Sequence, residues 1–431
     1  MIRHFCTITK TVARTVPGHG KVPVMLCCAI FLTGLWTPTR SVAQPGASSG
    51  PKPTRSQDDT HMRLGRFVLA PEITSRATHD DNIFLSDDNA QSDVITTITP
   101  RLHLSGDWPF FRMHMTIGGG LGFFAKSDQD NYQDAEAKAA GSIDLGPSSV
   151  DGAIEWHRQH DQRGSNDVPT GAREPVIYRD VRAHIGGRYA TSSLQYESRL
   201  SLRRLDFEDS TAINGNAIRN DDRDRLETRE TLRAVMPFDP GREAYGEITL
   251  NQRQYDRTPD DSGRVRDSAG YQIYGGLRFD LTDLIRADLA AGWMSQSYVD
   301  PAFGNINDYT LRADIDWSVT RLTSLSFTAA RAVRETTVQG ASGILALETG
   351  IGVTHELLRT LQIGANARYR NDAFQQTTRT DRVRSIGLDL DYQLNRFARI
   401  NSTVGHEIRQ STSNGEDYAR LQSQISLKLE M

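Results

Sequence analysis

Residues 417–431 read DYARLQSQISLKLEM, and apolar and polar side chains alternate along them. The apolar side chains share one parity, which holds Ala419, Leu421, Ile425, Leu427, Leu429 and Met431. The polar side chains share the other, which holds Arg420, Gln422, Gln424, Ser426, Lys428 and Glu430. Because a β-strand points successive side chains to opposite faces, this segment predicts a strand with one apolar and one charged face. Such a strand suits a wall between lipid and water.

The same unit recurs from about Leu64 to the last residue, in segments of roughly 9 to 15 residues. The pattern predicts strands at 64–76, 92–105, 109–125, 132–145, 148–159, 176–190, 192–207, 224–236, 242–255, 268–280, 283–298, 308–319, 322–336, 343–354, 358–371, 382–394, 396–410 and 417–431. It therefore indicates an all-β protein, a transmembrane up-and-down antiparallel β-barrel of about 18 strands, with 16 as the lower bound.

The breaks between the predicted strands alternate in length. Those after odd-numbered strands are long and polar, such as 160–175 and 208–223, which are also candidates for a constriction. Those after even-numbered strands are compact turns, such as 106–108 and 239–241. Long loops at one rim and short turns at the other are typical of outer-membrane barrels. An even number of strands places both ends of the barrel at the short-turn rim, which we expect to face the periplasm.

The first 43 residues are expected to form a secretory signal peptide. Basic residues precede an apolar run over 22–36, and Ser41-Val42-Ala43 offers a small-residue cleavage site. The run is shorter than the ~20 residues of a membrane-spanning helix. Residues 44–63 are rich in Pro, Gly, Ser and Asp, and we expect a flexible periplasmic lead-in there. The predicted barrel then occupies 64–431.

All three cysteines, Cys6, Cys27 and Cys28, lie within the expected signal peptide. An exported chain without disulfides needs another source of stability, and a closed barrel supplies it by pairing every strand edge. Five of the 50 basic residues and none of the 54 acidic residues lie in 1–43, which leaves a net charge of −9 for the remainder. This negative balance does not favour nucleic acid as a partner.

No pattern in the sequence predicts a catalytic centre, a metal site or a cofactor. His157 and His160 would face opposite sides of a strand, so their spacing does not favour a metal site. Gly118-Gly119-Gly120 lies inside a predicted strand, where a phosphate-binding loop is not expected. Groups at a barrel rim meet only in space, so a rim-located lipid hydrolase stays open as a less favoured alternative.

The polar parity of the strands is the candidate functional surface. Between residues 192 and 319 it holds Arg199, Arg203, Arg225, Arg229, Arg233, Tyr245, Glu247, Tyr274, Arg278, Arg312, Asp314 and Asp316. Barrels of about this strand number leave an aqueous channel, so we expect these side chains to line a lumen. Mixed charges along a lumen suit polar or anionic solutes. Ion pairs that stiffen the wall are the other interpretation of the same residues.

Aromatic side chains near the ends of the predicted strands are expected to form girdles at the level of the lipid headgroups. They are Trp156, Tyr309, Trp317, Tyr369, Tyr392 and Tyr418. Because β-propensity enriches aromatic residues in any strand, only their collective placement supports the expectation.

Several loop and turn motifs resemble those of an outer-membrane barrel family known as beta-barrel porin 2. They are His79-Asp80-Asp81-Asn82-Ile83-Phe84, Asn220-Asp221-Asp222-Arg223-Asp224-Arg225, Gly340-Ala341-Ser342-Gly343 and Thr354-His355-Glu356-Leu357-Leu358-Arg359. The resemblance covers about 65–431. It implies a role beside polysaccharide synthesis and export systems, since members of the family often accompany them. Met431 departs from the terminal aromatic residue of most outer-membrane barrels, which bears on recognition by the barrel assembly machinery.

We therefore expect a passive aqueous conduit in the outer membrane of a Gram-negative bacterium, assisting exopolysaccharide export, with a periplasmic N-terminus. A general diffusion porin for small polar solutes is the alternative, and a non-conducting structural barrel is less favoured. The expected partners are outer-membrane lipid and lipopolysaccharide, the barrel assembly machinery, a periplasmic polysaccharide export protein and the polysaccharide itself. No enzymatic activity is expected.

Overall fold

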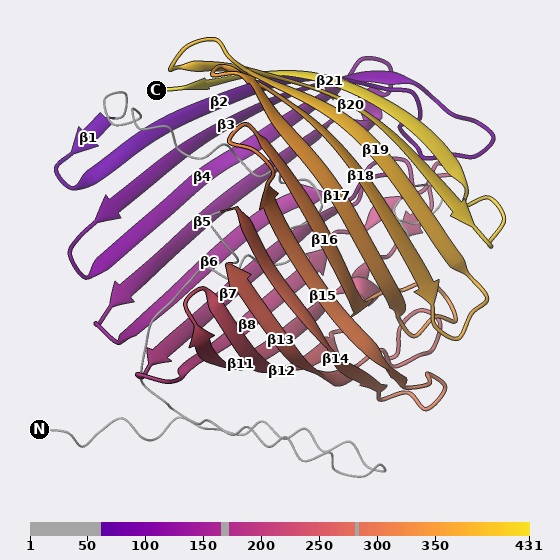
Figure 1. Ribbon diagram of the computed structural model, residues 1–431. Helices are drawn as coiled ribbons and strands as arrows, with labels where there is room; N and C mark the ends of the chain where they lie inside the picture. Colours follow the sequence, from indigo (N-terminus) through magenta and orange to yellow (C-terminus); the bar gives the residue numbers. More distant parts are fainter. Residues whose placement is uncertain (1–61, 165–171, 281–283) are drawn as a thin grey trace, which may run out of the picture. The chain divides into compact units, whose positions relative to one another are not determined.

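The computed structural model describes residues 62–164, 172–280 and 284–431, which form one antiparallel β-barrel (Figure 1). The expected signal peptide and nearly all of the expected lead-in lie outside the described residues. Within the described part of the chain, no helix is long and apolar enough to cross a membrane. Helical structure there is limited to two 3-10 turns, η2 at Asp128–Asp130 and η3 at Asp221–Arg223.

Eighteen long strands make the wall of the barrel. They are β2 (Phe67–Asp80), β3 (Asp93–Asp107), β4 (Phe111–Phe124), β5 (Tyr132–Asp144), β6 (Ser148–His160), β7 (Ile177–Ala190), β8 (Gln195–Phe207), β11 (Arg225–Asp239), β12 (Arg242–Tyr255), β13 (Ser268–Asp280), β14 (Ile285–Tyr298), β15 (Ile306–Ser318), β16 (Thr323–Arg334), β17 (Ile344–Leu358), β18 (Leu361–Phe374), β19 (Thr380–Gln393), β20 (Ala398–Ser411) and β21 (Tyr418–Glu430). Three short strands accompany them: β1 (Met62–Leu64) pairs with β2, and β9 (Ser210–Thr211) pairs with β10 (Ala217–Ile218) in a loop.

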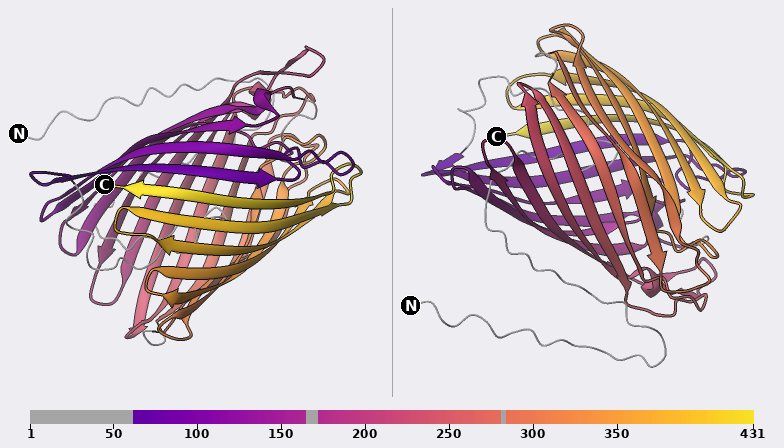
Figure 2. Two further views of the ribbon diagram at one scale, coloured as in Figure 1. Left: turned by 90° about the horizontal axis from the view of Figure 1, so that it is seen from above. Right: turned by 60° about the horizontal axis from the view of Figure 1, so that its bottom comes forward.

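The wall closes on itself because the last strand pairs with the first. The register between β2 and β21 runs from Glu72 opposite Glu430 to Asp80 opposite Gln422. The left view of Figure 2 shows the indigo β2 lying beside the yellow β21. β8 pairs directly with β11, since β9 and β10 lie in the loop between them. The predicted closed barrel of 18 strands is confirmed.

Loop length alternates around the barrel as the sequence predicts. One rim carries the long loops, including 81–92, 208–224 and 256–267, and the other carries short turns such as 108–110, 145–147 and 240–241. The turn between β11 and β12 is only Pro240-Gly241, and Gly241 adopts a φ of 71° that favours glycine. Both ends of the wall, the start of β2 and the end of β21, lie at the short-turn rim.

The two faces of the wall differ in polarity, as expected if one contacts lipid and the other water. On β19, Leu388 is 64% exposed and Ile386 is 61% exposed, although both are apolar. On the opposite face of the same strand, Asp381 is 0% exposed. Large apolar side chains are likewise exposed on many other strands, among them Ile117, Ile154, Ile185, Trp293, Ile351 and Ile425. The outward face is therefore the apolar one, as expected for a wall that contacts lipid.

The expected aromatic girdle is partly correct. Trp156, Tyr309, Trp317 and Tyr392 are exposed on the outward face. Tyr418 is buried instead, and its hydroxyl donates a hydrogen bond to Oε1 of Glu407 over 2.7 Å. Its assignment to the girdle was wrong because Tyr418 has the parity of Arg420, and that parity points into the barrel.

The outward face predicts a position-dependent cost for added charge. Leu388→Arg places a cation near the middle of the lipid-facing band and should lower the free energy of unfolding by about 2–4 kcal/mol. Thr403→Arg adds the same charge to the inward face of the neighbouring strand, opposite Asp389, and should cost much less. Urea unfolding of both variants in lipid vesicles tests this difference. Equal destabilisation of the two variants would contradict the assignment of the faces.

Candidate functional site

The inward face is identified by contacts between strands that are not neighbours. Nη1 of Arg312 on β15 lies 3.3 Å from Oε1 of Glu247 on β12, although β13 and β14 separate these strands. Three strand spacings amount to roughly 14 Å. Side chains bridge such a span on the concave side of a curved wall, where they converge. The register pairs each inward residue with an inward residue of the neighbouring strand. It therefore identifies the inward-facing residues of all the remaining strands.

A buried charged cluster covers the inward face of β11 to β15, which we call the β11–β15 cluster. Nε of Arg233 donates to Oε2 of Glu247 over 2.8 Å, and the two side chains are 7% and 4% exposed. Tyr245 Oη donates to Asp288 Oδ1 over 2.5 Å, and Arg312 donates to both Glu247 and Tyr245. Each carboxylate in the cluster faces a cation or a hydroxyl, which offsets the cost of burying charge.

Two aromatic rings stiffen the same cluster. The guanidinium of Arg233 lies 4.7 Å from the ring centroid of Tyr245, and that of Arg312 lies 5.1 Å from that of Tyr274. Tyr274 and Thr310 share a hydrogen bond of 2.7 Å between their hydroxyl oxygens. Both tyrosines are buried, so this side of the lumen presents a packed surface and not free rings. We find no exposed tyrosine here that could stack on a sugar.

The structure places the twelve sequence-predicted residues on the inward parity, but they do not form one group. Seven belong to the β11–β15 cluster or its edges: Arg233, Tyr245, Glu247, Tyr274, Arg278, Arg312 and Asp316, with Asp316 opposite Arg286. Arg199 and Arg203 on β8 instead contact Asp151 and Asp180 on earlier strands. Arg225 pairs with Glu227 over 2.8 Å. Arg229 and Asp314 are exposed on the inward face.

On the adjoining stretch of the wall, β3 to β8, the cations are open to solvent. The inward-facing side chains of Arg101, Lys138, Arg182 and Arg203 are each between 36% and 40% exposed, in contrast with those of the β11–β15 cluster. We call this stretch the open wall. Its cations face carboxylates at close range, for example Asp180, which accepts from Arg203 and Arg182. Asp180 itself is 0% exposed, whereas Glu155 is 32% exposed, so water reaches the cations and some of the carboxylates here.

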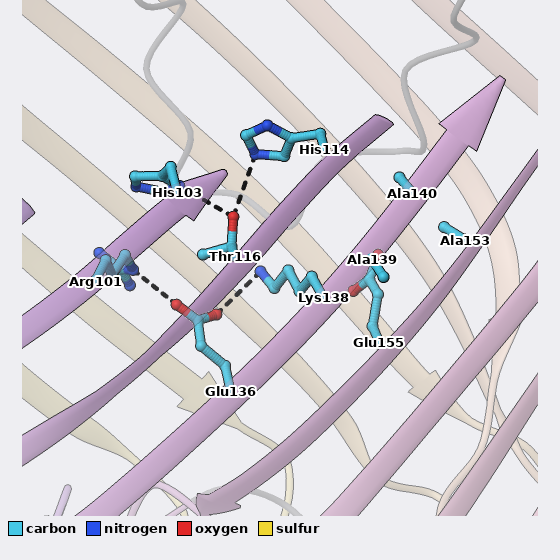
Figure 3. A pocket seen from close by; sticks show the side chains of 10 residues that line it. All are labelled: Arg101, His103, His114, Thr116, Glu136, Lys138, Ala139, Ala140, Ala153 and Glu155. Atoms are coloured by element: carbon cyan, nitrogen blue, oxygen red, sulfur yellow. Dashed lines mark hydrogen bonds and ion pairs between the residues drawn. The ribbon is translucent and has the colours of Figure 1, made fainter. Parts of the chain in front are cut away.

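The open wall holds a cavity of ≈ 420 Å³ between β3 and β6 (Figure 3). Arg101 and Lys138 both point toward Glu136, with N–O distances of 2.7 and 3.0 Å. Beside them, His103 and His114 each lie within hydrogen-bond distance of the Thr116 hydroxyl, at 3.0 and 3.2 Å. The cavity thus offers hydrogen-bond donors and acceptors within one recess.

The sequence-based selection missed these residues of the open wall. It was limited to the strands between 192 and 319, whereas Arg101, His103, His114, Glu136 and Lys138 precede them. The signal was present, because the same alternation assigns each of them to the polar parity of its strand.

Two loops fold together over part of the long-loop rim. The side chain of Arg266, in the loop 256–267, is buried and donates to Asp260 Oδ2 over 2.6 Å. It also donates to the carbonyl oxygens of Thr336 and Ala341, over 2.9 and 3.1 Å, in the loop 335–343. Burial alone would raise the pKa of Asp260, but hydrogen bonds from the Arg264 backbone, Ser262 and Arg266 hold that pKa below its usual value. The loops of β12–β13 and β16–β17 are thereby joined across β14 and β15.

A second loop reaches further around the rim. Nη1 of Arg409, on β20, donates to the carbonyl oxygen of Gly164, in the loop after β6, over 3.2 Å. Arg163 in the same loop donates to Asp130 Oδ1 over 2.8 Å. Asp161 accepts from Arg223, in the loop 208–224, over 2.6 Å. The described parts of the two sequence-predicted constriction loops therefore contact each other, and one of them also contacts a distant strand.

No metal site is evident in the described ranges, since they contain no group of three or more His, Cys, Asp or Glu residues that could hold an ion. His157 lies 3.2 Å from Glu155, and His160 lies 3.0 Å from Asp134. The two histidines therefore contact different carboxylates. What the inward face offers is a charged, partly hydrated surface.

Comparison with known proteins identifies the type of barrel. The sequence profile described as "Putative beta-barrel porin 2" matches residues 58–431. The comparison with curated proteins gave no match. Among solved structures, Pseudomonas aeruginosa OpdK with vanillate is 11% identical with a TM-score of 0.46, and the match covers 84% of this chain and 99% of that chain. A BenF-like porin from Pseudomonas fluorescens Pf-5 is 10% identical with a TM-score of 0.45, covering 84% and 99%.

The β11–β15 cluster predicts unequal roles for two carboxylates of β12. Glu247→Gln leaves Arg233 and Arg312 without their buried partner and should lower the free energy of unfolding by about 3–5 kcal/mol. Glu243→Gln on the same strand removes a partner of Arg278 whose carboxylate is 32% exposed, and should cost about 0–1 kcal/mol. Urea unfolding in lipid vesicles measures both. Similar costs for the two variants would show that the cluster is hydrated and not packed.

Proposed function

The chain belongs to the Putative beta-barrel porin 2 family, and from that membership we propose that it is a passive conduit serving exopolysaccharide export. It is a porin-like β-barrel channel of the Gram-negative outer membrane. The cargo, the direction of transport and the orientation of the chain are the proposed parts. In the proposed orientation, the short-turn rim and both ends of the wall face the periplasm.

The open wall is the observation that carries the proposal. Its cations stay 36% to 40% exposed, and of its carboxylates Glu155 is 32% exposed whereas Asp180 is fully buried, so water reaches both signs of charge along this stretch. A hydrated path with both signs of charge conducts polar and anionic solutes without holding them in one deep site. A hydrophilic polymer fits such a path, because arginine and lysine donate to its oxygens and carboxylates accept from its hydroxyls.

The assignment of polysaccharide as cargo also rests on the family resemblance of the loop motifs. A periplasmic export protein would deliver the polymer to the short-turn rim. There the turns are compact and leave the rim accessible, for example Pro240-Gly241 between β11 and β12.

A general diffusion porin is the second candidate, and the long-loop rim favours it. The Arg266 contacts and the Arg409 contact hold loops against one another at that rim. Small polar solutes pass more readily than a polymer where loops cover part of an opening. The two candidates therefore differ in the size of solute that the rim admits.

Deletion of the gene separates the two candidates. The export proposal predicts loss of secreted polymer, unchanged uptake of small sugars, and restoration of secretion by the full chain supplied on a plasmid. Extracellular polymer and radiolabelled sugar uptake are measured in the same cultures. Normal secretion together with slower sugar uptake would replace the export proposal with the diffusion porin.

Charge reversal on the open wall should change ion selectivity. Lys138→Glu places a carboxylate beside Glu136 and Glu155, so the cation-to-anion permeability ratio in planar bilayers should rise roughly twofold or more. Arg179→Glu makes the same charge change on the outward face of β7 and serves as the matched control. An equal shift in both variants, or in neither, would contradict conduction along the open wall.

A further inference from the structure

The outward face of β19 carries two arginines without a protein partner. Arg382 and Arg384 are both exposed, and within the described ranges neither makes an ion pair or a side-chain hydrogen bond. Other outward arginines differ in this respect. Arg204 contacts Asp256, Arg179 lies 3.7 Å from Glu208, and Arg331 lies 2.7 Å from Asp308. The two arginines of β19 thus form a cationic pair on the outward face without a carboxylate partner in the described ranges.

The orientation of this pair follows from the register. Arg382 lies between Asn371 on β18 and Gln410 on β20, and Arg384 lies between Tyr369 and Ile408. Ile386 and Leu388, which follow on the same face, are among the most exposed apolar residues of the barrel. The alternate residues Asp381 and Val383 are buried on the inward side.

Nearby carboxylates are engaged on the inward side and in the loops. Asp381 accepts from Arg379 and from the Ser411 hydroxyl. Glu416 accepts from Arg379 and Arg409, over 3.0 and 2.9 Å. Asp372 lies 2.9 Å from Arg370. Anions for Arg382 and Arg384 must therefore come from outside the described chain.

The height of Arg382 and Arg384 relative to the bilayer indicates where these anions come from. Arg384 is aligned with Tyr369, and the outward residues below it are Ile386, Leu388, Leu390 and Tyr392. Arg382 lies ten residues along the strand from Tyr392 of the aromatic girdle, which at a tilt of about 40° is roughly 25 Å of membrane thickness, the height of the apolar band in such barrels. The two arginines therefore lie at the headgroup level of the leaflet next to the long loops. Charge at that level is tolerated far better than at the centre of the bilayer.

We propose that Arg382 and Arg384 bind the phosphate groups of a phosphorylated glycolipid in the outer leaflet. Two arginines two residues apart on one strand stand about 7 Å apart, and each guanidinium can hold a phosphate through two parallel hydrogen bonds. The amides of Asn371 and Gln410 flank Arg382 and add donors. The acyl chains would lie along Ile386, Leu388 and Leu390. The proposal depends on the orientation given under Proposed function, with the long loops outside, but not on the cargo.

The test measures binding of diphosphoryl lipid A to the full barrel in phosphatidylcholine nanodiscs, by native mass spectrometry. The double variant Arg382→Gln/Arg384→Gln should lose affinity about tenfold or more, since two charge-assisted contacts disappear. The matched control, Arg179→Gln/Arg204→Gln, removes two outward arginines that already have carboxylate partners and should bind as the wild type does. Dephosphorylated lipid A should bind the wild type and the double variant equally weakly.

Unchanged affinity of the double variant, or an equal loss in the control, would overturn the proposal. So would displacement of lipid A by an excess of inorganic phosphate, which would indicate a site for free phosphate. Conductance in phosphatidylcholine bilayers should be the same for the wild type and the double variant. A failure of lipid binding with normal conductance therefore rejects the lipid site alone and leaves the conduit in place.

Discussion

The closed hydrogen-bond ladder between the first and last strands is the constraint on which the rest of the structure depends. Backbone N–H and C=O groups find no partners in hydrocarbon, so an open sheet edge cannot lie in a membrane. The pairing of β2 with β21, from Glu72 opposite Glu430 to Asp80 opposite Gln422, removes both edges. Once the wall is closed, every side chain is assigned to the outside or the inside by its parity alone.

Closure also decides how charge is distributed. The inward parity collects arginines and carboxylates on a concave surface, and side chains from strands three apart meet there, as Arg312 and Glu247 do. Where they meet, over β11 to β15, the charges are buried and mutually neutralised. Over β3 to β8 the cations also face carboxylates but stay more than one-third exposed. The β11–β15 cluster therefore supplies rigidity, and the open wall supplies a path for polar solutes.

Much of this arrangement could be predicted from the sequence because the period of a strand is two. The strands, the alternation of loop length and the inward parity of residues such as Arg233 and Arg312 follow from that period. The difference between the β11–β15 cluster and the open wall does not follow from the period, because it depends on which side chains converge when the sheet curves. The Arg266 contacts were equally hidden, because they join loops that are about 70 residues apart in the chain. Tyr418 was misassigned because its aromatic character was weighed above its parity.

The central claim is that alternate residues of one strand face water and lipid, and cysteine accessibility tests it most directly. Single cysteines would be placed at 199–203 of β8, in a chain whose three natural cysteines are replaced by serine, and treated with a charged, membrane-impermeant thiol reagent in intact proteoliposomes. We predict modification at positions 199, 201 and 203 and none at positions 200 and 202. Modification that is uniform along the strand, or confined to positions 200 and 202, would contradict the account.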